Sequence, residues 1–364
     1  MNNNKGKAEA ENTILCSSTQ LQNYCADILN NYGVPLKDAY IVSQSLVNAD
    51  LRGVNSHGVT RMGIYVERIK HGLINTEPDI KIIRERGGTL LVDGGNGLGA
   101  VVTMKALSFG LERVSKYGSC SIGIRNSNHY GAAAFYIKEA IQHNIMVQMY
   151  SNAPPTMAPW GGVDPYLGTN PFSFGIPSKR YHPIIVDMAS SVVARGKIIL
   201  AAKEEQPIPY GWAIDKNGVP TNDAQKALEG SVLPFGGPKG YCIALMIDIM
   251  AGVLTLSNFG NHIPDLYREM TKPQNIGAFI QLTGIEFFMP LEIFFDRVDT
   301  MISEIKASRT APGVNEIYLP GEIEAISEKR KSKEGIQLSR TTVDMLIDLG
   351  KPFGLDFSHV VIPS

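Results

Sequence analysis

Between residues 80 and 187 the chain alternates short runs of β-branched residues with longer amphipathic segments. Such alternation is typical of an α/β domain, because helices cover the faces of a sheet that its strands would otherwise leave exposed. We therefore expect an α/β fold. The predicted strands are 80–84, 89–93, 120–125, 145–150, 172–176 and 184–187, and the predicted helices among them are 100–117 and 132–143.

Helical periodicity flanks this region on both sides. It predicts helices at 19–31, 36–51 and 59–71 before the strands, and at 241–256, 292–307, 322–334 and 341–349 after most of them. A short hairpin is predicted at 211–220. We expect a helical domain at 1–76, joined by C-terminal helices at about 323–364. An α/β domain at 77–322 completes the chain, with a helical excursion at about 240–275.

Composition excludes several classes of partner. A net charge of -1 over 364 residues gives no electrostatic attraction for nucleic acid or an anionic membrane, so we expect neither. The longest apolar run, at 241–256, is short for a bilayer span and contains Asp248. Four cysteines without CxxC spacing predict reduced thiols. Residues 1–11 lack the apolar core of a signal peptide and have the composition of a disordered tail, so we expect a cytoplasmic protein.

Residues 50–65 carry the densest group of chemically useful side chains. If this run opens a helix, His57, Arg61 and Tyr65 stand at i, i+4 and i+8 along one face. An imidazole, a guanidinium and a phenol can hold the carboxylate of a 2-oxo or 2-hydroxy acid and move a proton at its C2 oxygen. A helix start capped by Asn55 or Ser56, with a merely solvated polar face, fits the same residues.

A glycine-rich turn at 94–100 matches the GxGxxA spacing of a dinucleotide fingerprint, with Gly95, Gly97 and Ala100 between a strand and a helix. The next predicted strand ends at Arg125, where an NAD-type fingerprint requires an acidic residue, although an arginine suits a 2′-phosphate. The alternative is a turn whose glycines let a helix pack closely on a sheet.

His129 lies between a predicted strand and an alanine-rich helix start. We place it at the helix N-terminus, where the dipole favours the neutral ring. Neutral imidazole accepts a proton from a hydroxyl, so His129 is a candidate general base. A histidine that caps the helix or is hydrogen-bonded in the core is the alternative. Gly131, just beyond it, leaves room for a cofactor or another backbone to approach.

Two further segments suggest a ligand site. Asp187 ends a hydrophobic strand, where α/β proteins bind ligands; its carboxylate can orient an imidazole or cap a helix. Residues 234–240 form a glycine-rich loop that brings Lys239 to a helix N-terminus, a natural anion site suited to a pyrophosphate. Because Gly240 follows the lysine, the loop does not match a P-loop and nucleotide hydrolysis is not indicated.

A metal site is the main hypothesis from a different class. His57, His129 and Asp187 can be combined into a two-histidine, one-carboxylate site of a hydrolase or oxygenase. No HxH or HExxH spacing supports this combination, so we expect no metal. A non-catalytic binding module is less favoured, since it gives no common role to Arg61, His129 and Lys239.

Taken together, these segments resemble the type-2 malate/L-lactate dehydrogenase family, which includes ureidoglycolate, sulfolactate and diketogulonate dehydrogenases. The resemblance implies reversible hydride transfer between NAD or NADP and C2 of a 2-hydroxy or 2-oxo acid, in a homodimer with the active site close to the subunit contact. It also implies a mixed-sheet nucleotide-binding domain distinct from the Rossmann fold, which favours the packing interpretation of the glycine-rich turn. The matching stretches are 49–58, 126–131, 168–171, 186–189, 212–223, 236–241 and 319–322.

The resemblance also carries over site residues. Both His57 and His129 match histidines proposed as the proton-transfer group in different members of the family. Our interpretation of the residues prefers His129 as general base, with His57 as carboxylate ligand or second proton partner. The substrate pocket is matched by Ser56, His57, Arg61 and Tyr65, and the cofactor-contacting positions by Asp187, Met188, Ala189, Ser190, Lys239, Gly240, Gly321 and Glu322.

Substrate identity is less constrained. Arg61 argues for one carboxylate, and a second carboxylate, as in malate, needs another cation that the sequence does not locate. The frequency of malate enzymes in the family favours malate and oxaloacetate. Lactate, sulfolactate and ureidoglycolate are alternatives, as is reduction of a cyclic imine acid, because the same pocket serves C=N. No residue can be assigned to the ribose 2′ position, so NAD and NADP both stay open.

Overall fold

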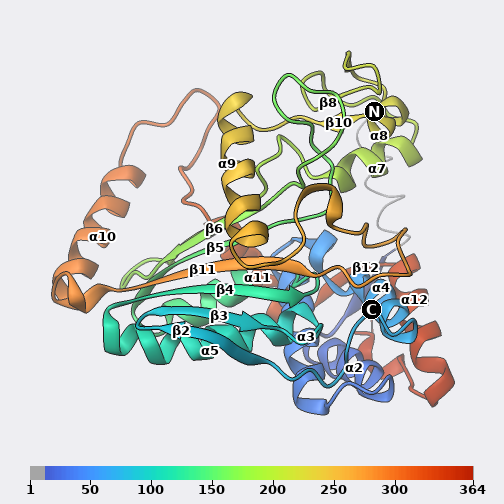
Figure 1. The fold of residues 1–364 in the computed structure, drawn as a ribbon, viewed down its shortest axis with the longest axis horizontal. Helices are drawn as coiled ribbons and strands as arrows, with labels where there is room; N and C mark the ends of the chain where they lie inside the picture. Colours follow the sequence, from blue (N-terminus) through green and yellow to red (C-terminus); the bar gives the residue numbers. More distant parts are fainter. Residues whose placement is uncertain (1–12, 364) are drawn as a thin grey trace.

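A mixed seven-stranded sheet forms the middle of the molecule, in the order β2-β3-β4-β11-β5-β6-β7 (Figure 1). The computed structural model describes residues 13–363, so the polar tail expected at 1–11 lies outside the described residues. β3 and β4 run parallel, and the other neighbouring pairs of this sheet are antiparallel. The strands are β2 (Lys81–Arg86), β3 (Thr89–Asp93), β4 (Ser119–Ser127), β5 (Ile145–Ser151), β6 (Phe172–Ile176), β7 (Ile184–Met188) and β11 (Ile276–Gly284).

Helices cover the two faces of the sheet unequally. On one face lie α5 (Gly99–Tyr117) and α6 (Ala134–Ile141). On the other lies a π-helical segment (Ile249–Val253) that continues α9 (Pro238–Asp248). Successive side chains of β4 point to opposite faces of the sheet, so each face can contact a different helix. Ile122 packs against Gly110 of α5, whereas the next residue, Gly123, approaches Thr255 on the opposite side.

A helical unit packs beside α5 and α6 and joins the two ends of the described chain. β1 (Thr13–Cys16) pairs antiparallel with β12 (Ile336–Ser339), close to the helices around it. Buried residues of these helices and of the sheet belong to one continuous hydrophobic core. The helices of the unit are α2 (Ser18–Asn31), α3 (Leu36–Leu51), α4 (Met62–Lys70), α11 (Glu322–Glu334) and α12 (Arg340–Gly350).

A second, smaller core lies between residues 157 and 244. Met157, Ile198, Val232 and Ala244 are among its buried members. It joins the start of α9 to a three-stranded sheet of order β10-β8-β9. The elements around it are α7 (Arg195–Lys203), β8 (Ala213–Ile214), β9 (Pro220–Thr221), α8 (Ala224–Glu229) and β10 (Ser231–Val232).

The α/β class is confirmed, and each predicted strand between residues 80 and 187 is present. The predicted hairpin at 211–220 appears as the antiparallel pair β8–β9. The most important strand that the sequence analysis did not predict is β11, which lies between β4 and β5. Its residues Ala278, Ile280 and Leu282 are buried at alternate positions, which is the pattern of a strand. Helices α7 and α8 were also not predicted, and the division into domains stays a prediction.

The glycine-rich turn after β3 is a packing device. A Cβ on Gly97 would lie 2.6 Å from the ring of Pro78, and one on Gly99 would lie 2.2 Å from the carbonyl oxygen of Asn128. Protein therefore fills the space that a pyrophosphate would occupy in a dinucleotide fingerprint. The predicted non-Rossmann fold is confirmed, since a largely antiparallel sheet replaces the doubly wound parallel one.

A last helix, α10 (Leu291–Lys306), extends from the end of β11 on the side away from the helical unit (Figure 1). Among the helices of residues 13–363, none combines the length and the apolar character needed to cross a membrane.

Candidate active site

His57, Arg61 and Tyr65 do not share one helix, the condition under which they would stand at i, i+4 and i+8; the helix predicted at 59–71 begins only at Met62. Two 3₁₀ turns, ending at His57 and Arg61, precede α4, and Gly58 separates them. Neither turn has a side-chain N-cap, so the alternative of a helix start capped by Asn55 or Ser56 is also wrong. The three side chains nevertheless stay near one another. The charge of Arg61 reaches both neighbours: it lowers the pKa of His57 and opposes the burial that raises the pKa of Tyr65.

A buried carboxylate explains this break in the helix. Asp50, near the end of α3, accepts a hydrogen bond from the backbone N–H of Val59 at 2.8 Å. A Cβ on Gly58 would lie 2.0 Å from Asp50 Oδ1, so the turn accepts only glycine there. Burial raises the pKa of Asp50 to about 7, although the Val59 amide and the charge of Lys331 act in the opposite direction. Asp50 therefore fixes the turn between His57 and Arg61.

His129 follows β4, but α6 begins only at Ala134, so its predicted position at a helix N-terminus is wrong. A hydrogen bond of 2.7 Å joins Tyr65 Oη to His129 Nδ1, and the backbone N–H of Gly131 donates to the same nitrogen at 3.4 Å. The amide can only donate and favours Nδ1 as acceptor, whereas Tyr65 Oη, the closer partner, can donate to this nitrogen or accept from it. The arrangement thus leaves Nε2 as the nitrogen for a substrate.

The two imidazoles stack, with ring centroids 5.5 Å apart and planes inclined by 24°. Burial and the charge of Arg61 lower the pKa of His57 to about 4. The pKa of His129 is also lowered, by burial first and then by Arg61 and His57. Both rings are therefore neutral at pH 7. The neutral ring expected for His129 is present, but burial and neighbouring charge produce it, not a helix dipole.

Arg61 presents a free guanidinium edge to this cluster. Its Nε donates to the carbonyl of Ser56 at 2.6 Å, and its Cζ lies 5.5 Å from the ring centroid of Tyr267. Within residues 13–363, neither Nη atom has a hydrogen-bond partner. Such an edge can grip a carboxylate through two parallel hydrogen bonds. Tyr65 stays a neutral phenol, because burial raises its pKa.

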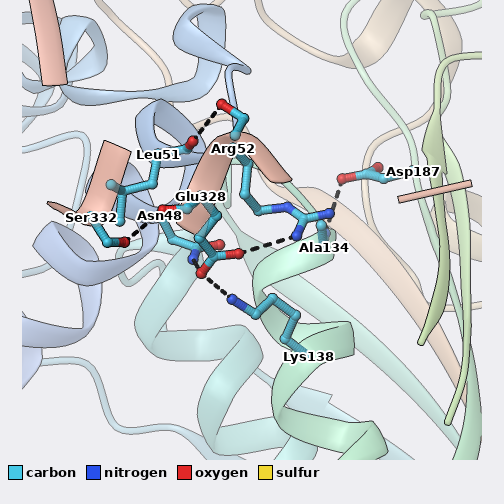
Figure 2. A network of polar contacts seen from close by, with 9 residues as sticks. Asn48, Leu51, Arg52, Ala134, Lys138, Asp187, Glu328 and Ser332 are labelled. Atoms are coloured by element: carbon cyan, nitrogen blue, oxygen red, sulfur yellow. Dashed lines mark hydrogen bonds and ion pairs between the residues drawn. The ribbon is translucent and has the colours of Figure 1, made fainter. Parts of the chain in front are cut away.

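Asp187 caps α6 and, in the described part of the chain, bonds to no histidine. Its Oδ2 accepts the backbone N–H of Ala134 at 2.9 Å, and its Oδ1 accepts the hydroxyl of Ser173 at 2.7 Å. Figure 2 shows the Asp187 carboxylate directed at the start of α6. Surrounding protein raises its pKa, although these hydrogen bonds and the charge of Arg52 lower it. Because α6 continues the His129 loop, this cap joins the end of β7 to that loop.

Behind Asp187 lies a polar network centred on Glu328 of α11 (Figure 2). The Glu328 carboxylate accepts hydrogen bonds from Arg52 at 3.3 Å, Asn48 at 3.0 Å and Lys138. The side chain of Arg52 is only 5% exposed. The network therefore holds α11 against α3 and α6. The turns that carry His57 and Arg61 follow α3, and the His129 loop precedes α6.

The segments expected to contact the cofactor meet along β7. The Phe235 amide donates to the Ser190 carbonyl at 3.1 Å, and a Cβ on Gly240 would lie 3.1 Å from the same oxygen. On the other side, the Ile185 amide donates to the Pro320 carbonyl at 3.0 Å, which brings the following Gly321 onto the strand. The three backbone segments thus form one continuous surface.

This surface includes a stretch with the features of a phosphate site. α9 begins beside it with Lys239 exposed in the first turn, after Gly236 and Gly237 at φ of 58° and 64°. A helix N-terminus with a lysine and a glycine-rich approach provides donors and positive charge for phosphate groups. Met188 is exposed at the end of β7, next to Ala189.

Two expected cofactor-contacting side chains are already engaged within the protein. The hydroxyl of Ser190 donates to the Thr169 carbonyl at 2.9 Å. The carboxylate of Glu322 accepts hydrogen bonds from Lys306 at 2.8 Å and from the Leu319 amide at 3.0 Å. These side chains therefore hold the backbone in place. A ligand at this position would contact the neighbouring peptide groups instead of these side chains.

No group of three or more His, Cys, Asp or Glu side chains within residues 13–363 is arranged to hold a metal ion. Sequence reasoning gave no role to Asp50, Arg52, Ser173 or Tyr267. The partners of these residues lie far away in the chain or in another loop, so no local spacing marks them. The one usable signal was a charged pair, Asp50 and Arg52, in an otherwise apolar helix end.

Comparison with known proteins agrees with this architecture. A family model described as malate/L-lactate dehydrogenase matches residues 16–347. L-sulfolactate dehydrogenase of Methanocaldococcus jannaschii is 38% identical over 92% of this chain and 96% of its own length, and malate dehydrogenase of Pyrococcus abyssi is 37% identical over 95% and 96%. The NAD(+)-dependent ureidoglycolate dehydrogenase of Escherichia coli is 32% identical over 84% and 87%. A solved structure of the M. jannaschii enzyme has a TM-score of 0.90 at 35% identity, covering 95% of this chain and 99% of that one.

The fold and these relatives define an α/β dehydrogenase of hydroxy acids that uses NAD or NADP. The chain belongs to the malate/L-lactate dehydrogenase family.

Proposed function

We propose that this enzyme interconverts malate and oxaloacetate by reversible hydride transfer at C2. The observation that carries the proposal is the grouping of Arg61, His57 and His129, with Tyr65 bonded to His129 at 2.7 Å. It provides a carboxylate-binding edge beside a group that can exchange a proton, which are the two needs of a 2-hydroxy acid. Malate dehydrogenase of P. abyssi is among the similar relatives.

In this proposal Arg61 binds the C1 carboxylate through its free Nη edge, which places the C2 oxygen toward the imidazoles. His129 exchanges the proton of that oxygen through Nε2. To accept that proton, the ring carries its own proton on Nδ1 and donates it to Tyr65 Oη at 2.7 Å; the Gly131 amide, 3.4 Å from Nδ1, is the weaker contact at that nitrogen. During oxidation Nε2 takes up the hydroxyl proton and the ring becomes an imidazolium; reduction starts from that imidazolium, which returns the proton to the C2 oxygen. His57, whose Nδ1 lies 3.0 Å from Ser56 Oγ, lines the other side of the site.

The bound nicotinamide supplies or accepts the hydride. The chain's own contribution is to hold the dinucleotide along residues 187–190, 239–240 and 321–322, beside the His129 loop. Asp187 supports this placement because it caps α6, the helix that continues that loop. Lys239 provides positive charge for the phosphates at the start of α9.

The test is a spectrophotometric assay of reduced nicotinamide. Purified protein is mixed with NADH or NADPH and, in turn, oxaloacetate, pyruvate, phenylpyruvate, sulfopyruvate and a cyclic imine acid. We expect the highest kcat/KM for oxaloacetate. A higher value for sulfopyruvate, pyruvate or the imine would replace malate by the corresponding product. Absence of turnover with every acid and both cofactors, from folded protein, would contradict the proposal as a whole.

We further propose a homodimer that forms through α9 and its π-helical continuation. Leu245, Met246, Ile249 and Val253 are exposed at helical spacing on one face and are 37 to 49% accessible. Ile249→Glu is expected to produce monomers in sedimentation experiments, whereas an unchanged mass would contradict this interface.

We also propose a cytoplasmic location, which the cysteines support. All four are unpaired thiols in the structure, and burial raises the pKa of Cys16 and Cys120 to about 11. Thiols that stay protonated are poorly reactive.

A further inference from the structure

Tyr267 lies on a loop that is far from Arg61 in sequence but touches it in space. Its aromatic ring is 5.5 Å from Arg61 Cζ, within the range of a cation–π contact. The second restraint on the guanidinium is the hydrogen bond from Nε to the Ser56 carbonyl at 2.6 Å. These two contacts leave the Nη edge without a partner among the described residues, as a carboxylate ligand requires.

The loop that carries Tyr267 is closed on itself. Gln274 donates to the Pro264 carbonyl at 3.2 Å, which brings the two ends of the loop together. Asp265 accepts the backbone N–H of Tyr267 at 2.8 Å and that of Arg268 at 2.9 Å, so a local turn fixes the backbone at the aromatic residue.

A buried arginine anchors this loop to the helix that follows Arg61. Arg68 of α4 is fully buried. Its guanidinium donates to the carbonyls of Leu266 at 3.2 Å, Glu269 at 2.9 Å and Lys272 at 3.0 Å. Burying an arginine in this way is costly unless its donors are paired; here one loop pairs both Nη atoms, while the buried Nε has no partner among the described residues. Arg61 and Tyr267 are thus held by elements that are joined rigidly to each other.

We propose that Tyr267 is a substrate-positioning residue, which holds the Arg61 guanidinium edge-on toward the carboxylate of the acid. The inference rests on the proposed role of Arg61 as the carboxylate ligand. The ring lies against the guanidinium, so the edge is left for a planar carboxylate to form two parallel hydrogen bonds. The substrate class that follows is a 2-oxo or 2-hydroxy acid whose C1 carboxylate is free, and not an ester or amide of it.

The test compares Tyr267→Ala with Tyr267→Phe, which keeps the ring. Oxamate, a non-reacting analogue of a 2-oxo acid, is titrated into each enzyme with reduced cofactor bound, so that the readout does not depend on turnover. We expect Tyr267→Ala to weaken oxamate binding and raise KM about 2–5-fold, the range of a cation–π contact at an exposed site, since Tyr267 is 56% exposed. Tyr267→Phe is expected to match the wild type, and kcat to change little in either variant.

Tyr117→Ala is the matched control, since Tyr117 is also exposed and precedes β4, whereas His129 follows the opposite end of that strand. It is expected to leave oxamate binding unchanged. In an Arg61→Lys background, Tyr267→Ala is expected to have little further effect, because the stacked planar group is gone. Equal oxamate affinity in Tyr267→Ala and wild type would overturn the proposal, as would an equally large loss in Tyr267→Phe.

The design separates this inference from the proposed function. If wild type binds oxamate but reduces no 2-oxo acid, the proposed reaction fails while the role of Tyr267 is still measured. If Arg61→Lys binds oxamate as tightly as wild type, Arg61 is not the carboxylate ligand and both proposals fail.

Discussion

The carboxylate of Asp50 accepts the backbone N–H of Val59 at 2.8 Å from a position with 1% exposure. This contact lies where two 3₁₀ turns stand between α3 and α4, in place of the one helix that would align His57, Arg61 and Tyr65. It places a titratable group directly beneath the segment that carries His57 and Arg61. Both the stability of the protein and the geometry of its site therefore depend on Asp50.

We predict that Asp50 makes the folded state less stable as the pH rises toward neutrality. Its folded pKa of about 7 is raised above the unfolded value of 3.8, so the folded chain binds the proton more tightly. The stabilisation from the bound proton is complete below pH 3.8 and is lost as pH rises through 7. At 1.36 kcal/mol per unit, the loss is up to about 4 kcal/mol.

The measurement is urea unfolding of wild type and Asp50→Asn across this range. Asparagine keeps an acceptor for the Val59 amide and carries no charge, so the difference between the two proteins isolates the titration of Asp50. The histidines contribute with the opposite sign in both proteins and cancel. A difference in unfolding free energy that stays constant from pH 4 to pH 8 would contradict the assignment.

We predict that His129→Gln lowers kcat by about 10²–10⁴-fold, as the loss of a general acid or base typically does. Tyr65→Phe, which removes only the hydrogen bond to Nδ1, is expected to cost about 10²-fold, through misplacement of the ring. His57→Gln is the matched comparison and is expected to raise KM more than it lowers kcat. Near-normal turnover in His129→Gln, together with loss in His57→Gln, would exchange the roles of the two histidines.

The same histidines predict an unusual pH profile. An ordinary histidine base loses activity below its pKa of about 6.5. Here the pKa of His57 is lowered to about 4 and that of His129 is also lowered, so both rings stay neutral well below pH 6.5. For oxidation of the hydroxy acid, we expect kcat/KM to show no histidine-type decline between about pH 7 and pH 5. A decline centred near pH 6.5 would show that the rings are more accessible to water than in this structure.

We predict that Glu328→Ala destabilises the protein by roughly 1–3 kcal/mol, because it leaves the buried guanidinium of Arg52 without its charged partner. Glu328→Gln keeps the hydrogen-bonding shape and is expected to cost less. Thermal unfolding of both variants gives the comparison, with Glu334→Ala at the exposed end of α11 as control. Equal stability of Glu328→Ala and wild type would mean that Arg52 finds another partner.

Much of the local structure was predictable because it depends on local periodicity. The strands between residues 80 and 187 and the helices around them follow from alternating or helical burial of apolar residues. β11 shows the same alternation at Ala278, Ile280 and Leu282. The sequence therefore contains a signal for this strand, although the strand was not predicted. The break at Gly58 is different, because its cause is a carboxylate on the preceding helix.

The candidate site was also predictable only in part. The residue types at His57, Arg61 and Tyr65 sufficed to suggest a carboxylate and a proton, because that chemistry belongs to the side chains themselves. Their arrangement did not follow: the partner of Tyr65 is His129, 64 positions along the chain, and the partner of Arg61 is a tyrosine on a third segment. The sequence alone determined which groups are present and which segments are helix or strand. Tertiary packing decided which groups touch and which are charged, because desolvation and contact between remote segments exist only after the chain has folded.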